Sequence, residues 1–238
     1  HHTVSLAGLI GGGAVLRPGE VSLAHRGVLF LDELLELPRH VLDAMRQPLE
    51  DGRVVLSRAA GAVGFPARFQ LVGAANPCPC GRHGDATGRC QCSAHQMARY
   101  RARLSGPLID RIDLHVQVDA VPSTALATPA TGDTSAVIRG RVLAARARQA
   151  ERFRQLPGVR LNAEAPGRWI REQVRFDDAA RRCLERAVER LGLSARAYHR
   201  TLRVARTVAD LDGVEVVDVG ILSEALSFRA EGDSTFQG

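Results

Sequence analysis

The sequence has 238 residues, which is enough for one sizeable hydrophobic core, or for one core and a small second domain. Its 45% hydrophobic and 24% charged residues exclude a disordered chain, and no apolar run approaches the ~20 residues of a membrane span. The net charge of +6 permits a polyanionic partner, and because all basic residues are arginine, a complete lysine-containing phosphate loop is excluded. No secretory signal opens the chain, so we expect a cytoplasmic protein.

The first segments lead to an apolar run that ends in two carboxylates. Residues 5–10 favour a short helix, and residues 14–23 predict two short strands around a Pro-Gly turn. Residues 27–31 do not alternate with polar groups, which predicts a strand buried on both faces, as in the parallel sheet of an α/β domain. Asp32 and Glu33 follow directly. One carboxylate there suits Mg²⁺ and the second suits an attacking water, while a strand running into a helix cap is the alternative.

A second strand brings a polar residue to the same edge. Residues 68–76 predict another buried strand, which has small residues toward its end and finishes at Asn76. Ligands of open parallel sheets bind beyond the carboxyl ends of the strands. We therefore expect Asp32, Glu33 and Asn76 to form one site at one sheet edge.

The segment between these strands predicts a helix and a hairpin. Pro38 opens the helix and Gly52 ends it, with apolar residues on one helical face between them. Residues 53–58 and 62–65 then predict a hairpin with arginines at its base and tip. These arginines suit either an ordinary solvated edge or contact with a polyanion.

Four cysteines lie in two close pairs across a glycine-rich loop, residues 78–92. The pairs are Cys78 with Cys80 and Cys90 with Cys92. Two close pairs of thiols suit a tetrahedral zinc site, although the C-x-C spacing is less diagnostic than C-x₂-C. Disulfides are the rival interpretation, which the lack of a secretory signal disfavours, and simple packing within the loop is the third. The remaining Cys183 lies in a helical pattern and suits a core position.

A small-residue linker at 120–136 marks the predicted domain boundary. Before it, Arg111 stands at the start of an alternating strand, residues 114–118, where an arginine can reach a neighbouring subunit. A surface ion pair with an adjacent aspartate is the alternative for Arg111. The predicted domains are residues 1–119 and 137–230.

The second domain is predicted to be helical. Residues 137–155 form an arginine-laden helix that suits a solvated face better than a nucleic-acid contact. Three further helices are predicted, which end at Leu191, Leu211 and Phe228. Their predicted caps are Asp177 or Asp178, then Ser194, then Asp218, and Gly192 ends the first of them. We expect residues 231–238 to be a frayed tail.

Several long strings make this chain similar to one family. They are residues 12–20, 27–33, 65–69, 76–81, 105–113 and 194–200. With these strings, the chain resembles the AAA+ ATPases of the magnesium-chelatase-like branch, and within it the ComM (YifB) group. The resemblance implies the C-terminal part of an α/β AAA+ core over residues 1–119, followed by a small all-α lid.

The resemblance also implies a role for particular residues. Asp32 would hold Mg-ATP and Glu33 would be catalytic, as the Walker B pair, and Asn76 looks like the first sensor. Arg111 looks like the arginine finger offered to an adjoining protomer, and Arg196 like the second sensor, which reaches the γ-phosphate. Such residues position and neutralise charge, which is most of what phosphoryl transfer requires.

The same resemblance places two hairpins at the pore of a ring. The DNA-contact candidates on them are Arg17, Arg53 and Arg58. The implied machine is a homo-oligomeric ring, a hexamer, acting on single-stranded or branched DNA in recombination of transforming DNA. Its implied cofactors are ATP and Mg²⁺. The spacing of the cysteines, and not the resemblance, adds zinc as a candidate ion. A chelatase-type ATPase that remodels a metal-insertion partner, and a non-enzymatic zinc-stabilised nucleic-acid-binding module, remain alternatives.

The family's phosphate loop and N-terminal domain have no counterpart in these residues. We therefore expect the chain by itself to be inactive as an ATPase, and the expected motor activity belongs to an intact protein that includes the phosphate loop.

Overall fold

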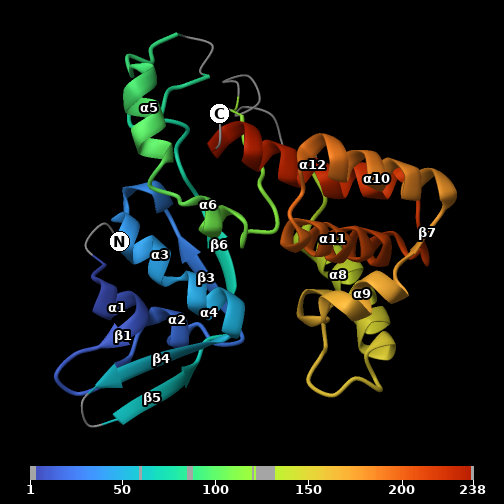
Figure 1. Ribbon diagram of the computed structural model, residues 1–238, viewed down its shortest axis with the longest axis horizontal. Coiled ribbons are helices and arrows are strands. Elements are labelled where there is room, and N and C mark those ends of the chain that lie inside the picture. The colour runs from blue at the N-terminus through green and yellow to red at the C-terminus, as the bar shows by residue number, and fades with distance from the viewer. Residues whose placement is uncertain (1–3, 59–60, 85–87, 120, 122–131, 237–238) are drawn as a thin grey trace. The chain divides into compact units, whose positions relative to one another are not determined.

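The computed structural model describes residues 4–58, 61–84, 88–119, 121 and 132–236 (Figure 1). The chain divides into two compact units between Ile112 and Asp113, and the last residues, from Asp233, group with the first unit. The division lies seven residues before the predicted end of the first domain, and most of the predicted linker lies outside the described residues. Among the described residues, no helix combines the length and hydropathy that crossing a membrane would need.

The first unit mixes short helices with strands. Its helical segments are α1 (Leu6–Ile10), α2 (Glu20–Leu23), η1 (Leu34–Glu36), α3 (Arg39–Ala44), α4 (Arg46–Asp51), α5 (Ala94–Arg101) and α6 (Gly106–Ile109). Its strands are β1 (Gly11–Gly12), β2 (Arg17–Pro18), β3 (Val28–Leu31), β4 (Arg53–Arg58), β5 (Gly61–Pro66) and β6 (Gln70–Gly73). Their buried apolar side chains form one core.

In the residues that the structure describes, the second unit is helical apart from one short strand pair. Its segments are α8 (Ser135–Arg152), η2 (Asn162–Glu164), α9 (Gly167–Gln173), β7 (Arg175–Phe176), α10 (Asp178–Leu191), α11 (Ala195–Asp212), β8 (Val216–Val217) and most of α12 (Val219–Phe236). This unit has its own hydrophobic core. The predicted class, an α/β part with a parallel sheet followed by a helical part, is confirmed.

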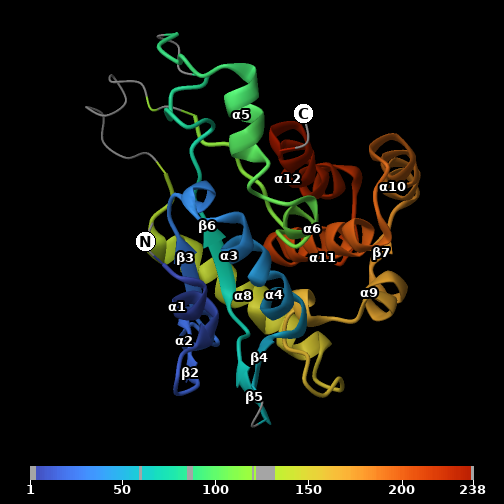
Figure 2. The ribbon, with the colours of Figure 1, turned by 60° about the vertical axis from the view of Figure 1, so that its left-hand side comes forward.

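The parallel pair β3 and β6 lies at the centre of the first unit (Figure 2). Leu31 at the end of β3 is opposite Gly73 at the end of β6. The pairing continues past both strands, since the Ala74 amide donates to the Leu31 carbonyl at 2.9 Å and the Leu34 amide donates to the Ala74 carbonyl at 2.8 Å. The residues that follow both strands therefore leave the sheet at the same edge.

One face of this sheet differs from the prediction. Leu29 and Leu31 are buried in the core, but Val28 is 58% exposed and Phe30 is 60% exposed. The prediction of a strand buried on both faces is wrong, because the described residues cover only the face that carries the two leucines.

The hairpin predicted over residues 14–23 is also wrong in its register. The antiparallel pair is β1 with β2, and the residues after Gly19 form helix α2 instead of a strand. Gly11, Gly12 and Gly13 all have positive φ angles, which only glycine adopts readily, so the chain can pair and turn before residue 17. Gly19 lies so close to this glycine backbone that a Cβ there would come within 2.4 Å of the Gly11 nitrogen.

The predictions that rest on helix caps agree with the structure better than those that rest on strand patterns. Asp177 caps α10 and Ser194 caps α11 as predicted, and Gly192 ends α10 in the left-handed conformation. Residues 114–118 form no strand, and α12 extends to Phe236, beyond the predicted end of the last helix. An alternating pattern needs a partner strand, whereas a cap acts within its own helix.

A buried carboxylate organises the helices of the second unit. Asp210 in α11 is fully buried, and it accepts hydrogen bonds from Arg152 in α8 at 2.7 and 2.5 Å and from the Asn162 amide at 2.8 Å. Arg206, also buried, donates to the same carboxylate at 3.2 Å. Burial by itself would raise the pKa of Asp210, but the hydrogen bonds from Arg152 and Asn162 outweigh it and lower the pKa.

We predict that Asp210→Asn destabilises the second unit by about 3–5 kcal/mol, because it leaves the buried Arg206 and the half-buried Arg152 without their carboxylate. The lowered pKa means that this stabilisation is complete above the unfolded pKa of an aspartate, about 3.9, and is lost as the pH falls through the folded pKa. Urea denaturation between pH 3 and pH 7 measures both effects. The exposed Asp212→Asn is the control, and equal stability of the two variants at pH 7 would contradict the assignment.

Candidate functional site

The carboxylate pair stands where the sequence predicts it, immediately after β3. Asp32 is exposed and Glu33 is half-buried. Glu33 has φ of +51°, in the left-handed region that non-glycine residues rarely adopt, and its amide donates to the Asp32 carboxylate at 2.9 Å. Burial of Leu34 and Leu35 and the Leu34–Ala74 hydrogen bond hold this turn in place. A strained conformation that its surroundings enforce is typical of functional sites.

Asn76 is exposed and lies three residues after the end of β6. A Cβ at Gly81 would meet the Asn76 side chain at 3.7 Å, so this amide packs against the cysteine loop. Because β3 and β6 are paired in parallel and in register, the carboxylates and Asn76 follow the same ends of adjacent strands. Oxygen atoms of this kind are the ligands that Mg²⁺ prefers.

Arg111 follows α6, and its side chain is only 8% exposed. It donates to the Pro107 carbonyl at 2.6 Å and forms an ion pair with Glu50 of α4. Both residues line a cavity of about 570 Å³ in the first unit, together with Leu6, Ile10 and Asp43. The guanidinium of the predicted finger is therefore bound within its own chain in this structure.

The other predicted arginines are exposed where the structure describes their side chains. Arg196 is the second residue of α11, in the second unit. Arg17 lies on β2 and Arg53 begins β4. The side chain of Arg58, at the other end of β4, lies outside the described residues. Figure 2 shows that β4 and β5 form a hairpin projecting from the first unit, as predicted.

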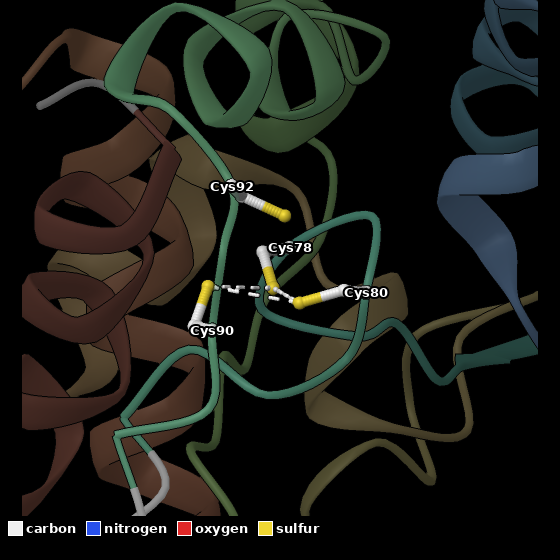
Figure 3. Close-up of side chains that lie close together, drawn as sticks. All are labelled: Cys78, Cys80, Cys90 and Cys92. Carbon is white, nitrogen blue, oxygen red and sulfur yellow. Dashed lines mark hydrogen bonds between the residues drawn. The ribbon is translucent and has the colours of Figure 1, made fainter.

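The four cysteines converge although the two pairs are ten residues apart in the sequence (Figure 3). All four sulfur atoms lie within 4.8 Å of one another, and all four residues are free thiols. The Sγ atom of Cys78 lies 3.4 Å from that of Cys80 and 3.8 Å from that of Cys90, and the Sγ atoms of Cys80 and Cys90 are 3.6 Å apart. Cys78 is buried, Cys80 is exposed, and the other two are half-buried. This cluster could bind a metal ion.

The close contacts within this cluster give its thiols different pKa values. A hydrogen bond from the Arg82 backbone amide, and then the thiols of Cys78 and Cys92, lower the pKa of Cys80 to about 6. A backbone hydrogen bond with Cys80 also favours the Cys92 thiolate, but the Cys80 side chain and desolvation outweigh it and raise the pKa of Cys92 to about 12. The Cys80 thiolate accepts hydrogen bonds, whereas the Cys92 thiol keeps its proton beside Cys80, so the two thiols lose their protons at different pH values.

Sequence reasoning missed the groups that brace this region. Arg103, two residues beyond the end of α5, donates to the Leu35 carbonyl at 2.6 Å and to the Glu36 carboxylate at 3.0 Å. The Ser105 hydroxyl donates to Asp43 at 2.5 Å, and Glu50 pairs with Arg111. Each pair joins residues more than 60 positions apart, so no local pattern could have identified the partners.

Comparison with known proteins now gives the family. Residues 1–126 match the family model described as magnesium chelatase, subunit ChlI, and residues 132–229 match the model of its C-terminal region. Together with the parallel sheet and its acidic edge, these matches show that the chain belongs to the magnesium chelatase ChlI family.

Within that family, the curated relatives that are similar over nearly the whole chain include magnesium-chelatase-like proteins of the ComM group. The chain is 47% identical over 231 residues to the competence protein ComM of Haemophilus influenzae, and 45% identical to the uncharacterized protein YifB of Escherichia coli. Each alignment covers 97% of this chain but 44% of the relative, so the chain spans less than half of their length. The magnesium-chelatase 38 kDa subunit of Cereibacter sphaeroides is 36% identical over 66 residues, which are 28% of this chain and 20% of that protein.

We predict that Glu50→Gln destabilises the first unit by about 1–3 kcal/mol, because Arg111 is nearly buried and loses a charged partner. Urea denaturation at pH 7 measures the change. Asp51→Asn, at the next position in α4 and exposed, is the matched control. If Glu50→Gln and Asp51→Asn unfold at the same urea concentration, the ion pair does not stabilise the fold.

Proposed function

We propose that this chain is part of an ATP-driven AAA+ ring motor that acts on DNA, with a ComM-like helicase or branch-migration role in the recombination of transforming DNA. The observation that carries the proposal is the parallel register of β3 and β6, which sends Asp32, Glu33 and Asn76 to one edge. The similarity to a protein named competence protein ComM supports the biological setting.

The acidic edge suits the hydrolysis of a nucleoside triphosphate. In the proposal, Asp32 binds Mg²⁺, directly or through water, and Glu33 accepts a hydrogen bond from the attacking water and draws off its proton. The Asn76 amide orients the same water. The chain has no lysine for the phosphates, so a phosphate loop must come from elsewhere in the intact protein.

Two arginines complete the proposed site. Arg111 neutralises developing charge on the γ-phosphate of an adjoining protomer, and Arg196 approaches the phosphate from the lid. The pairing of Arg111 with Glu50 implies that the guanidinium must leave that carboxylate, or share it, when the ring assembles. Loss of activity in an Arg111 variant therefore needs a stability measurement beside it.

DNA is the proposed substrate of the motor, and the proposed assembly is a cytoplasmic hexamer without a membrane partner. The chain is basic, and exposed arginines stand on β2 and at the base of the β4–β5 hairpin. ATP and Mg²⁺ are the proposed cofactors at the acidic edge, and zinc is the proposed ion at the four cysteines.

The first test requires a longer polypeptide in which a segment with a Gly-Lys-Ser or Gly-Lys-Thr phosphate loop precedes this chain. We expect its ATPase activity to rise with single-stranded or branched DNA. Glu33→Gln should lower the turnover number by about 10²–10⁴-fold, as expected for loss of a general base, with ATP binding retained. Turnover is followed by phosphate release and binding by a fluorescent nucleotide.

Glu185→Gln, an exposed carboxylate in α10, is the control and should keep full turnover. Turnover that no DNA stimulates would contradict the DNA motor. Turnover that instead depends on a porphyrin and a partner subunit would establish the chelatase-type alternative. Equal activity of Glu33→Gln and the control would remove Glu33 from the site.

The second test concerns the arginines. If Arg17 and Arg53 contact phosphates, each change to alanine should weaken DNA binding uniformly across sequences and reduce the salt slope by about 1. Fluorescence anisotropy at several salt concentrations measures the slope. Arg175→Ala, an exposed arginine in β7, serves as the comparison. Slopes equal to that of the unchanged protein in both hairpin variants would exclude these contacts.

A further inference from the structure

We propose that Cys78, Cys80, Cys90 and Cys92 hold one zinc ion as a tetrathiolate centre, and that this centre fixes the backbone that carries Asn76. The metal centre stands on the geometry of the cysteines alone. Its consequence for Asn76 as a catalytic group rests on the proposed function.

The sulfur separations match a single tetrahedral ion. A Zn–S bond of about 2.3 Å places the sulfurs of a regular tetrahedron about 3.8 Å apart. The separations among Cys78, Cys80 and Cys90 are 3.4, 3.6 and 3.8 Å, and Cys92 completes a set that lies within 4.8 Å (Figure 3). An iron–sulfur cluster would need wider spacing, because its four cysteines are divided among two or more irons and do not all bind one ion.

The first cysteine pair lies on a turn that brings backbone amides close to the sulfur atoms. The Gly81 amide donates to the Cys78 carbonyl at 2.9 Å, and Gly81 has φ of +73°, which a side chain would oppose. This turn lets the backbone amides of Arg82 and His83 hydrogen bond with the Cys78 sulfur, and the Arg82 amide also reaches Cys80. Amide donors aimed at sulfur stabilise the thiolate form, and a metal ion requires thiolates.

Packing alone does not explain four converging thiols. Free cysteine usually behaves as a small buried hydrophobe, yet only Cys78 of the four is buried. Three sulfur-bearing side chains at a partly exposed site contribute little to a core. Four thiolates around a divalent cation, by contrast, replace mutual repulsion with attraction. Hard ions such as Mg²⁺ prefer oxygen ligands, so the donor set selects a soft or borderline metal such as zinc.

The centre ties together two elements of the first unit. Cys78 comes two residues after Asn76, whose side chain packs beside Gly81 of the same turn. Cys92 comes directly before Ser93, which caps α5 in a reciprocal capping box with Gln96. From α5, the buried Tyr100 enters the core. A bound ion therefore joins the end of β6 to the start of α5, and the Asn76 segment lies between fixed points.

The first experiment measures metal in the purified 238-residue chain. We expect about one zinc per chain by elemental mass spectrometry, and Co²⁺ substitution should give the visible absorption bands of a tetrahedral thiolate complex. Cys90→Ser/Cys92→Ser should lose the zinc, while Cys183→Ser should keep it. Zinc-free protein with an unchanged fold, zinc retained in the double variant, or disulfides among the four cysteines would each overturn the centre.

The second experiment compares zinc-loaded and chelator-treated chain by hydrogen exchange and limited trypsin digestion. Removal of zinc should speed amide exchange over residues 74–81 and cleavage after Arg82 and Arg89, with residues 195–212 of α11 unchanged as the internal control. Unchanged exchange over 74–81 would overturn the link to Asn76 and leave zinc binding intact. Neither readout involves ATP, so failure of the proposed motor activity leaves both results standing.

Discussion

The parallel pairing of β3 with β6 is the constraint on which the candidate site depends. Four residue pairs, from Val28 opposite Gln70 to Leu31 opposite Gly73, set the point at which each strand ends. Side chains alternate along a strand, so a slip by one residue would turn Leu29 and Leu31 away from the core. Burial of these two leucines therefore fixes the register, and the register brings the chain after each strand to a common edge.

Residues next to α5 contact the chain that follows β3 at this edge. Arg103, just beyond that helix, holds the Leu35 carbonyl and the Glu36 carboxylate, both within η1, which directly follows the acid pair. Cys92 leads into the same helix, and Cys78 leads away from Asn76. Thus the turns on both strands of the pair are linked to one helix, although they belong to distant parts of the sequence.

In the second unit, a single buried charge positions the helices relative to one another. Asp210 receives donors from α8, η2 and its own helix, so three elements are positioned by one carboxylate. A buried ion pair contributes less to net stability than its number of hydrogen bonds suggests, because its desolvation is costly. Its effect is to penalise alternative packings, since any arrangement that separates these partners leaves a charge unpaired inside the protein.

Signals within a few residues were readable from the sequence, and long-range pairings were not. Asp177, Ser194 and Asp218 each cap a helix, because the capping oxygen and the amide it accepts from are three residues apart. The two parallel strands, the hairpin at residues 53–65 and the cysteine pairs were also visible. The strand expected at 114–118 failed because alternation says nothing about a neighbour, and the pairing of Arg111 with Glu50 joins residues 61 positions apart. Sequence spacing suggested a metal site, but the convergence of four sulfurs could only come from the fold.

One face of the β3–β6 pair is apolar and is left exposed by the described residues. Phe30 and Val72 are opposite each other in the register, and with Val28 they present apolar side chains to water. Contiguous surfaces of this kind take up hydrophobic dyes and adhere to one another at high concentration. Sample preparation should therefore favour dilute solutions, and a rise in light scattering on concentration would report self-association through this patch, without loss of the native fold.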